Sequence, residues 1–210
     1  MTSSARTQLT KDSLIKAAVA VLQRRGFAAA TARAIADEAG SNQGLIFYHF
    51  GSVTKLLLAA LDFVSAEREN RYSLALANTT STSELAALAA MIFTEDLDRG
   101  DTAVLVEMLA GCSSTPGLGS EVKARIEPWT EFAARAVETA IAGTVLDGVV
   151  KADEIAHVVV ALYLGLELLS HLDGDRTQAI AIFERAKTLA PLLDNLSNSA
   201  SLSSKKMETT

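Results

Sequence analysis

Apolar residues recur every three or four positions along most of the chain, which is the spacing of an amphipathic helix. The clearest case is an apolar face made of Leu14, Ile15, Ala18, Val21 and Leu22. Thr10 is a suitable N-cap, Asp12 suits the positive end of a helix dipole, and Gly26 stands where a helix commonly ends. These features predict a helix over residues 10–25.

Similar patterns predict about nine helices in all. One starts behind Thr31 and ends at Gly40, a short one covers 42–48, and a long one runs from Gly51-Ser52 to residue 77. Five more are expected over residues 83–99, 101–112, 120–142, 153–172 and 177–196. Pro128 lies within the 120–142 helix or marks its kink. Residues 1–7 and the Ser-, Asn- and Thr-rich residues 197–210 are expected to be disordered.

Composition agrees with an all-α protein. The strong helix formers Ala and Leu occupy 36 and 28 of the 210 positions, and only three Pro interrupt the chain. Because β-branched residues rarely alternate with polar ones, a β-sandwich or a barrel is disfavoured. The length fits one large domain or two small ones, with enough apolar residues for a sizeable core.

Charge is distributed unevenly along the chain. Residues 1–60 carry 7 Lys and Arg against 3 Asp and Glu, whereas residues 61–210 carry 12 against 22. A basic segment on an acidic body favours a local contact with a polyanion. Segments of this size also differ by several charges through chance, so the charge pattern alone leaves both interpretations open.

Several classes of protein are disfavoured by what the chain lacks. A single cysteine, Cys112, excludes an intramolecular disulfide and a Cys-rich zinc site, and the first residues lack the apolar segment of a secretory signal. The longest apolar stretch, residues 155–172, contains Glu167 and has acidic residues on both flanks, so a buried or interface helix is expected there rather than a membrane span. The expected location is the cytoplasm, with no membrane partner.

Residues 31–50 have the layout of a helix-turn-helix. Ala36 is small where two helices approach closely, and Gly40 stands at a turn whose positive φ costs other residues more. The residues spaced to close a small core with the first helix are Ile35, Ala39, Ile46 and Phe50. The second helix of such a pair can enter a DNA major groove. Any two short helices around a glycine imitate this pattern, so alone it is not specific.

The neighbouring residues make the pattern specific. They are Gly26-Phe27, Thr31, Ile35-Ala36, Ala39-Gly40, Gly44, Phe47-Tyr48-His49-Phe50-Gly51-Ser52 and Leu56-Leu57. This run closely resembles the TetR family of helix-turn-helix transcriptional regulators. The resemblance implies a three-helix DNA-binding domain over residues 8–68 and a helical ligand-binding and dimerisation domain over residues 69–196. It also implies a homodimer that binds palindromic operator DNA, typically as a repressor that a small-molecule effector releases.

The resemblance further implies which residues contact DNA. Thr31 caps the second helix and aims its backbone N–H groups at a phosphate. Arg33 can reach a base edge or the DNA backbone, and Arg favours guanine. In the third helix Gln43 can pair with adenine, and Asn42 can either do the same or contact phosphate.

More contacts are implied along the third helix. Gly44 lets this helix lie close to the groove, and Leu45 can touch a thymine methyl group. Tyr48 and His49 occupy positions at which the family contacts backbone phosphates. Phe47 stands where the family often has tyrosine, so any contact through a hydroxyl is lost.

The start of the fourth helix departs from the family pattern. Val53 stands where members usually have lysine, and Lys55 follows two residues later in the first turn of that helix. A cation there opposes the helix dipole. Lys55 is therefore interpreted as a phosphate contact or, alternatively, as an ordinary solvated lysine.

The C-terminal part is expected to hold a ligand pocket and a dimer interface. Candidate pocket residues, each also suited to plain core, are Met91, Phe93, Met108, Cys112, Trp129 and Phe132. The family forms a four-helix interface from its last two helices, and apolar residues spread over more than one face of the 153–172 helix. Candidate interface residues are Val158, Val159, Leu162, Tyr163, Leu166 and Leu169. The alternative is a central helix of a monomeric bundle.

Ionisable residues outside these sets leave several readings open. His157 and His171 are too far apart in sequence for one metal ion at i, i+4 spacing and are expected in the core or at an interface. Glu167 can pair across an interface, line a pocket or face solvent. Neither a catalytic Ser or Cys cluster nor a phosphate-binding glycine motif is visible, so no enzyme activity, cofactor or metal site is expected. An architectural DNA-binding protein would not need the large apolar C-terminal part.

Overall fold

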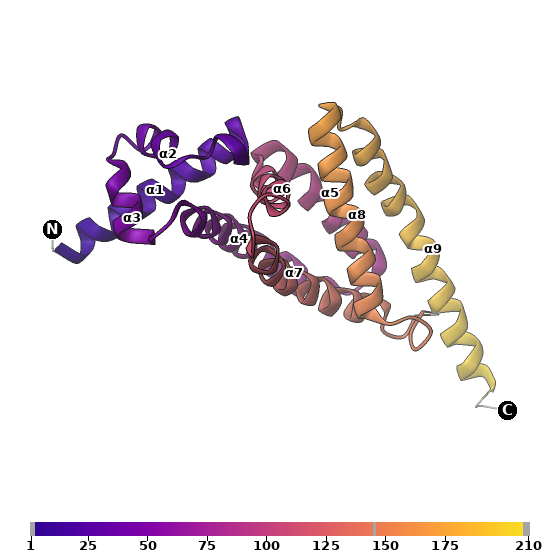
Figure 1. Ribbon diagram of the computed structural model, residues 1–210. Helices are drawn as coiled ribbons and strands as arrows, with labels where there is room; N and C mark the ends of the chain where they lie inside the picture. The colour runs from indigo at the N-terminus through magenta and orange to yellow at the C-terminus, as the bar shows by residue number, and fades with distance from the viewer. Residues whose placement is uncertain (1–2, 145, 208–210) are drawn as a thin grey trace. The chain divides into compact units, whose positions relative to one another are not determined.

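The computed structural model describes residues 3–144 and 146–207, and this part of the chain is all-α, as predicted. It contains nine α-helices, one short 3₁₀ helix and no strand. The helices are α1 (Ser3–Arg25), η1 (Phe27–Ala29), α2 (Ala32–Glu38), α3 (Gln43–Phe50), α4 (Val53–Ala77), α5 (Thr82–Arg99), α6 (Asp101–Cys112), α7 (Leu118–Ile141), α8 (Ala152–Asp173) and α9 (Thr177–Met207) (Figure 1).

The first and last helices are longer than their patterns predict. Helix α1 begins at Ser3, so Thr10 is not an N-cap but lies within the helix, where its Oγ1 donates to the carbonyl oxygen of Arg6 at 3.0 Å. Helix α9 continues to Met207, through residues expected to be disordered. Both extensions lack Gly and Pro, so a helix that has already formed can propagate through their Ser and Thr residues at small cost. Residues 1–2 and 208–210 of the predicted tails lie outside the described residues.

The chain forms two compact units that are not simply its two ends. Unit 1 consists of Met1–Asn70 and Arg99–Arg125, and unit 2 of Arg71–Asp98 and Ile126–Thr210. The predicted boundary at residue 68 is therefore incomplete. Helix α6 and the beginning of α7 belong with the N-terminal helices, and α4 and α7 each contribute to both units.

The core of unit 1 forms around the helix-turn-helix. Ile35 of α2 and Ile46 of α3 are fully buried, as predicted, and so is Leu14 of α1. The predicted partners Ala39 and Phe50 are only half-buried. Gly40 has a φ of +58°, which confirms the predicted left-handed turn between α2 and α3.

Helix α6 is fastened to the link between α1 and α2, and we call this contact the α6 clamp (Gln23, Phe27, Gly100, Glu107 and Gly111). Gln23 Nε2 donates to the carbonyl oxygen of Gly100 at 3.0 Å. The backbone N–H of Phe27 donates to Glu107 Oε2 at 2.7 Å. The Phe27 ring lies over Gly111, where a Cβ atom would come within 2.5 Å of the ring carbons. This approach is possible only because Gly111 has no side chain.

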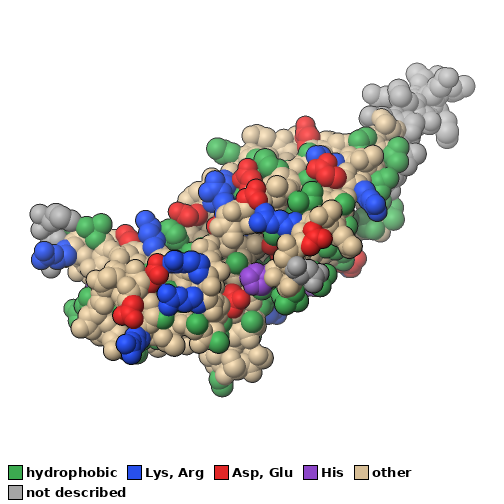
Figure 2. Space-filling model, turned by 90° about the horizontal axis from the view of Figure 1, so that it is seen from above, with side chains coloured by type: hydrophobic (Ala, Val, Ile, Leu, Met, Phe, Trp, Pro, Cys, Tyr) green, Lys and Arg blue, Asp and Glu red, His purple; other side chains and the backbone are tan. Residues whose placement is uncertain are grey.

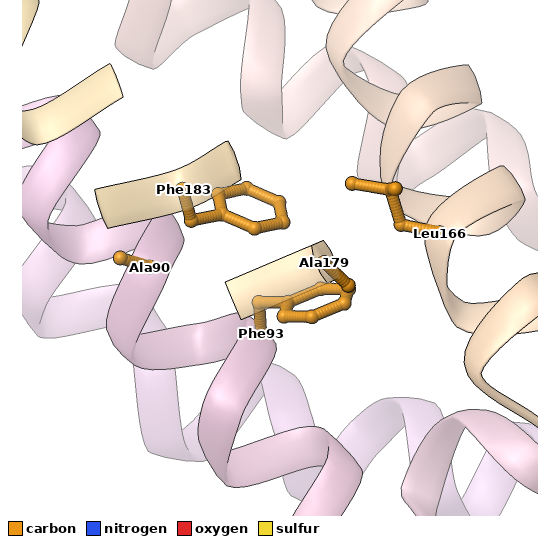
Figure 3. Packing of buried hydrophobic residues seen from close by; sticks show 5 residues of the cluster. All are labelled: Ala90, Phe93, Leu166, Ala179 and Phe183. Carbon is orange, nitrogen blue, oxygen red and sulfur yellow. The ribbon is translucent and has the colours of Figure 1, made fainter. Parts of the chain in front are cut away.

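The core of unit 2 contains a cluster of aromatic and aliphatic side chains from α5, α8 and α9, which we call the aromatic cluster; Figure 3 shows five of its residues. Phe93 of α5 is fully buried, with its ring centroid 4.5 Å from that of Phe183 of α9 and 5.5 Å from that of Tyr163 of α8. Leu166 of α8 is buried in the same cluster. Packing of α5, α8 and α9 therefore depends on these rings.

A buried carboxylate lies beside this cluster. Asp96 of α5 is fully buried and accepts hydrogen bonds from the hydroxyls of Tyr163 and, at 3.0 Å, of Tyr72. Arg71 lies 3.8 Å from the same carboxylate. Burial raises the pKa of Tyr72, so its hydroxyl remains a donor at physiological pH. The polar groups of Asp96 are thus satisfied by neighbours from α4 and α8.

The start of α5 is capped from α9. Backbone N–H groups of Thr82 and Ser83 each donate to the Asp194 carboxylate at 3.1 Å, and both hydroxyls donate to it as well. Partial burial opposes ionisation, but the hydrogen bonds from Ser83 and Thr82 hold the pKa of Asp194 below its usual value. Asp194 therefore serves as an N-cap supplied by another helix.

Substituting Gly111→Ala should destabilise the protein, because the new methyl group overlaps the Phe27 ring. We expect a loss of about 1–3 kcal/mol in the free energy of unfolding, measured by urea denaturation. Gly119→Ala is the matched control, because a Cβ there lies 4.0 Å from the nearest side-chain atom. Equal free energies of unfolding of the two variants would show that the Phe27 ring does not approach Gly111 too closely to admit a methyl group. Phe27→Leu should recover part of the loss in Gly111→Ala.

Asp194→Asn should destabilise unit 2 by about 1–2 kcal/mol at neutral pH, because the amide replaces one acceptor oxygen by a donor. The pKa of Asp194 is lower in the folded protein than in the unfolded chain, where an Asp has a pKa of about 3.9. Its carboxylate therefore stabilises the folded protein fully above the unfolded pKa, and this stabilisation is lost as the pH falls through the folded pKa. The gap between wild type and variant should therefore narrow below about pH 4. Asp98→Asn, which loses only a surface ion pair with Arg176, should cost much less. A pH-independent gap would contradict this account.

Candidate nucleic-acid interface

The N-terminus of α2 presents two of the predicted contact residues. Thr31 is in an extended conformation and its Oγ1 accepts from the backbone N–H of Ala34 at 3.2 Å, which confirms Thr31 as the N-cap. The side chain of Arg33 is 86% exposed and lies 3.9 Å from Asp37, a separation at which a surface ion pair contributes little. Arg33 is therefore held only weakly and can reach a polyanion.

The N-terminus of α3 is closed by its own predicted contact residue. Asn42 is the N-cap, and its Oδ1 accepts from the backbone N–H of Gly44 at 2.7 Å. A Cβ atom at Gly44 would lie 3.2 Å from the same oxygen. Gly44 thus keeps the cap uncrowded, in addition to leaving the helix surface flat. The capping role of Asn42 was not predicted, although Asn before a helix is a common N-cap signal.

The rest of α3 has one buried and one exposed side. Ile46 is fully buried, whereas Gln43, Gly44, Phe47 and Tyr48 are exposed. Tyr48 has 80% of its surface exposed, and the half-buried His49 ring packs edge-on against it with centroids 4.8 Å apart. Leu45 lies at the margin of this side, 36% exposed. An exposed side that is rich in aromatic and amide groups is suited to contact with a partner.

The first turn of α4 places Lys55 beside a set of charged residues. Ser52 Oγ accepts from the backbone N–H of Lys55 at 3.1 Å, and the Lys55 side chain is exposed. Nearby, Arg125 binds Asp62 at 2.7 Å and Glu121 at 2.9 Å, and the bond to Asp62 raises the pKa of the guanidinium. Basic and acidic side chains are likewise interspersed on the face in Figure 2. Lys55, rather than Arg125, is available to a phosphate.

All nine predicted DNA-contact residues therefore lie within unit 1, on α2 or α3, at the N-caps of these two helices, or at the first turn of α4. The predicted ligand-pocket residues are divided between the units. Phe93 is fully buried in unit 2, Trp129 and Phe132 form a half-buried edge-on pair there, and Met91 is 41% exposed. Met108 and Cys112, which lie on α6, belong to unit 1.

The predicted interface residues on α8 also separate into two sets. Val158, Val159, Leu162 and Leu169 are between 38% and 65% exposed. Tyr163 and Leu166 instead pack inside unit 2, Leu166 within the aromatic cluster and Tyr163 against Asp96, which corrects their assignment to an interface. The periodicity identified the apolar residues of α8 but could not tell which of two apolar sides faces the core.

The structure narrows the alternatives for three ionisable residues of α8. Glu167 is only 3% exposed, which excludes the solvent-exposed alternative. His157 and His171 are exposed rather than buried in the core of unit 2. Over Ala152–Leu172 the helix has the length and mean hydropathy (1.7) of a membrane span, and only 17% of that segment is buried. Much of its apolar surface is therefore uncovered in a single chain.

Comparison with known proteins accounts for the helix-turn-helix. Residues 14–60 match the family described as "Bacterial regulatory proteins, tetR family". This segment therefore resembles the DNA-binding part of the TetR regulators, in agreement with the resemblance seen in the sequence. The proteins that it resembles are described as transcriptional regulators, which agrees with the expectation that the chain is not an enzyme. The matched segment begins within α1 and ends within α4, so it covers the C-terminal part of α1, all of α2 and α3, and the beginning of α4.

Individual relatives resemble different parts of the chain. The HTH-type transcriptional repressor NicS of Pseudomonas putida is 39% identical over 57 residues, which is 27% of either protein. The transcriptional regulator FadR of Bacillus subtilis, solved with stearoyl-CoA, has a TM-score of 0.69 at 14% identity and covers 85% of this chain and 96% of its own. A regulator of Saccharomonospora viridis, solved with choline, has a TM-score of 0.70 at 21% identity and covers 86% and 94%. The family match thus covers residues 14–60, whereas the solved structures share the fold over most of the chain.

Proposed function

We propose that the chain is a one-component transcriptional regulator that binds palindromic operator DNA as a homodimer, acts as a repressor and is released by a small-molecule ligand. The observation that carries this proposal is the exposed side of α3. Ile46 anchors the helix in the core of unit 1, while Gln43, Gly44 and Tyr48 project away from it. A short, rigidly held helix with an exposed amide-bearing side fits a DNA major groove.

The contacts divide into those that read bases and those that hold the DNA backbone. Bidentate recognition of adenine uses both the oxygen and the nitrogen of an amide. Asn42 Oδ1 already caps α3, whereas the Gln43 amide is exposed, so Gln43 is the favoured base reader. Arg33 is proposed to reach a base edge or the DNA backbone from the N-terminus of α2. Thr31, Tyr48, His49 and Lys55 are proposed to contact phosphates.

Dimerisation is proposed through the exposed apolar side of α8, extended by α9. On α8 this side includes Leu162, Leu169 and Leu172, and on α9 it includes Leu189 and Leu192, all between 46% and 70% exposed. Helices α8 and α9 contact one another within unit 2 (Figure 1). Burial of this surface against a second copy would make a two-fold dimer, which matches a palindrome with half-sites about one helical turn apart.

The ligand is proposed to bind in unit 2. The relatives solved with stearoyl-CoA and with choline show that one fold accepts chemically unlike ligands. In this chain the four candidates in unit 2, Met91, Phe93, Trp129 and Phe132, offer apolar contacts, whereas Met108 and Cys112 belong to unit 1. A DNA-binding activator or a ligand-independent regulator would use the same DNA interface and differ only in this part.

Gln43→Ala should relax sequence preference at one base of each half-site, at a cost of about 1–3 kcal/mol for the preferred base. Tyr48→Phe and His49→Ala should instead weaken binding to all duplexes about equally, because phosphate contacts carry no sequence information. Binding of purified variants to DNA selected from a random pool measures both effects. A uniform loss from Gln43→Ala, or a changed preferred sequence from Tyr48→Phe, would contradict the assignment.

Leu169→Glu should give folded monomers with little affinity for the operator, because a charge placed in an apolar interface is strongly unfavourable. Sedimentation velocity at micromolar concentration measures the association, and circular dichroism checks the fold. Leu74→Glu is the control, because Leu74 is 76% exposed on α4, outside the proposed interface. The proposal fails if the wild type sediments as a monomer, if Leu169→Glu remains dimeric, or if α8 instead carries the wild type into lipid vesicles.

A further inference from the structure

Phe47 is an exposed aromatic residue on the helix that we propose to enter DNA. Half of its surface, 51%, is accessible, although its neighbour Ile46 is fully buried. A large apolar ring on a surface is stabilised when a partner covers it. The sequence pattern identified only what Phe47 lacks, a hydroxyl group, and not what its ring contacts.

The geometry of α3 places Phe47 beside the proposed base reader. Successive residues of a helix are about 100° apart, so residues four positions apart differ by only about 40°. Phe47 is four positions after Gln43 and therefore shares its side of α3. Leu45, two positions after Gln43, lies about 160° from it on the other margin. If Gln43 faces a base edge, Phe47 faces the same groove and Leu45 is turned away.

The chemistry of the ring selects its partner. A phenyl group neither donates nor accepts ordinary hydrogen bonds, so it cannot satisfy the polar edges of adenine, guanine or cytosine. The 5-methyl group of thymine is the apolar feature of the major groove. We infer that Phe47 is a specificity-determining residue that packs on the methyl group of a thymine next to the base read by Gln43. This inference rests on the proposed DNA-binding function.

The two aromatic residues of α3 thereby have different tasks. Tyr48 keeps its hydroxyl, and its ring is braced edge-on by His49, which suits a fixed contact to phosphate. Phe47 has no ring partner of this kind among the aromatic pairs of the described residues, so its ring is open to DNA. The methyl-reading role that the family resemblance suggested for Leu45 passes to Phe47.

Replacement of single thymines by uracil tests the inference, because it removes only the methyl group. The operator is first selected from random DNA with wild-type protein, and each thymine is then replaced symmetrically in both half-sites. Replacement of the thymine next to the base that Gln43 reads should weaken wild-type binding about fourfold in each half-site, because one methyl contact is lost. Replacement of the other thymines should have no such effect through Phe47. Phe47→Ala should bind the thymine and uracil duplexes equally at that position.

Two variants serve as controls. Phe47→Tyr keeps the ring and should retain the preference for thymine, and Leu45→Ala should retain it too. Circular dichroism checks that Phe47→Ala is folded, which its half-exposed position favours. The signature is the loss of the thymine-to-uracil difference, which a general weakening of α3 would not produce.

The outcomes separate this inference from the proposed function. If the wild type selects no DNA sequence, the proposed function fails and this inference with it. Only the inference is overturned if the wild type selects an operator but Phe47→Ala still binds the uracil duplex more weakly than the thymine duplex at every position. The same holds if Leu45→Ala abolishes the difference at the thymine next to the Gln43 base. An operator without thymine next to the Gln43 base overturns it as well.

Discussion

The close approach of the Phe27 ring to Gly111 is the contact on which the DNA-binding part depends. Phe27 lies in η1, the link between α1 and α2, and its backbone N–H is also held by Glu107. Because the link is fixed to α6, the position at which α2 begins is fixed too, and with it the Thr31 cap. Gly40 then sets the direction of α3. A glycine on α6 therefore determines how precisely the exposed side of α3 is presented.

Local signals were sufficient for most of the fold. Thr31 and Gly40 take the conformations that their residue types favour, and α6 has the bounds that its pattern predicts. The membership of α6 in unit 1 could not be predicted, since a glycine in a helix shows nothing of the ring that packs on it. Glu107, the one charge of α6 beyond its first turn, is a signal that could have indicated a buried partner.

The candidate site was predictable by position but only partly by role. Helical spacing identified the side of α3 around Gln43, and the structure adds that Asn42 is used as a cap. On α8 the same kind of pattern placed Leu166 and Leu169 in one set, although Leu166 is buried and Leu169 is exposed. Periodicity shows that a residue needs an apolar partner, but the tertiary structure decides whether that partner lies in the same chain.

The discontinuity of unit 1 has a consequence for the nascent chain. The helix-turn-helix is complete once Asn70 has been synthesised, but Glu107 and Gly111 follow only after the segment 71–98, which belongs to unit 2. At about 5–20 residues per second, the ribosome takes on the order of 2–8 s to travel from Asn70 to the end of α6 at Cys112. During that interval the apolar surface around Phe27 has no α6 to cover it. The DNA-binding part of this chain is thus finished late in translation, although most of its residues are made first.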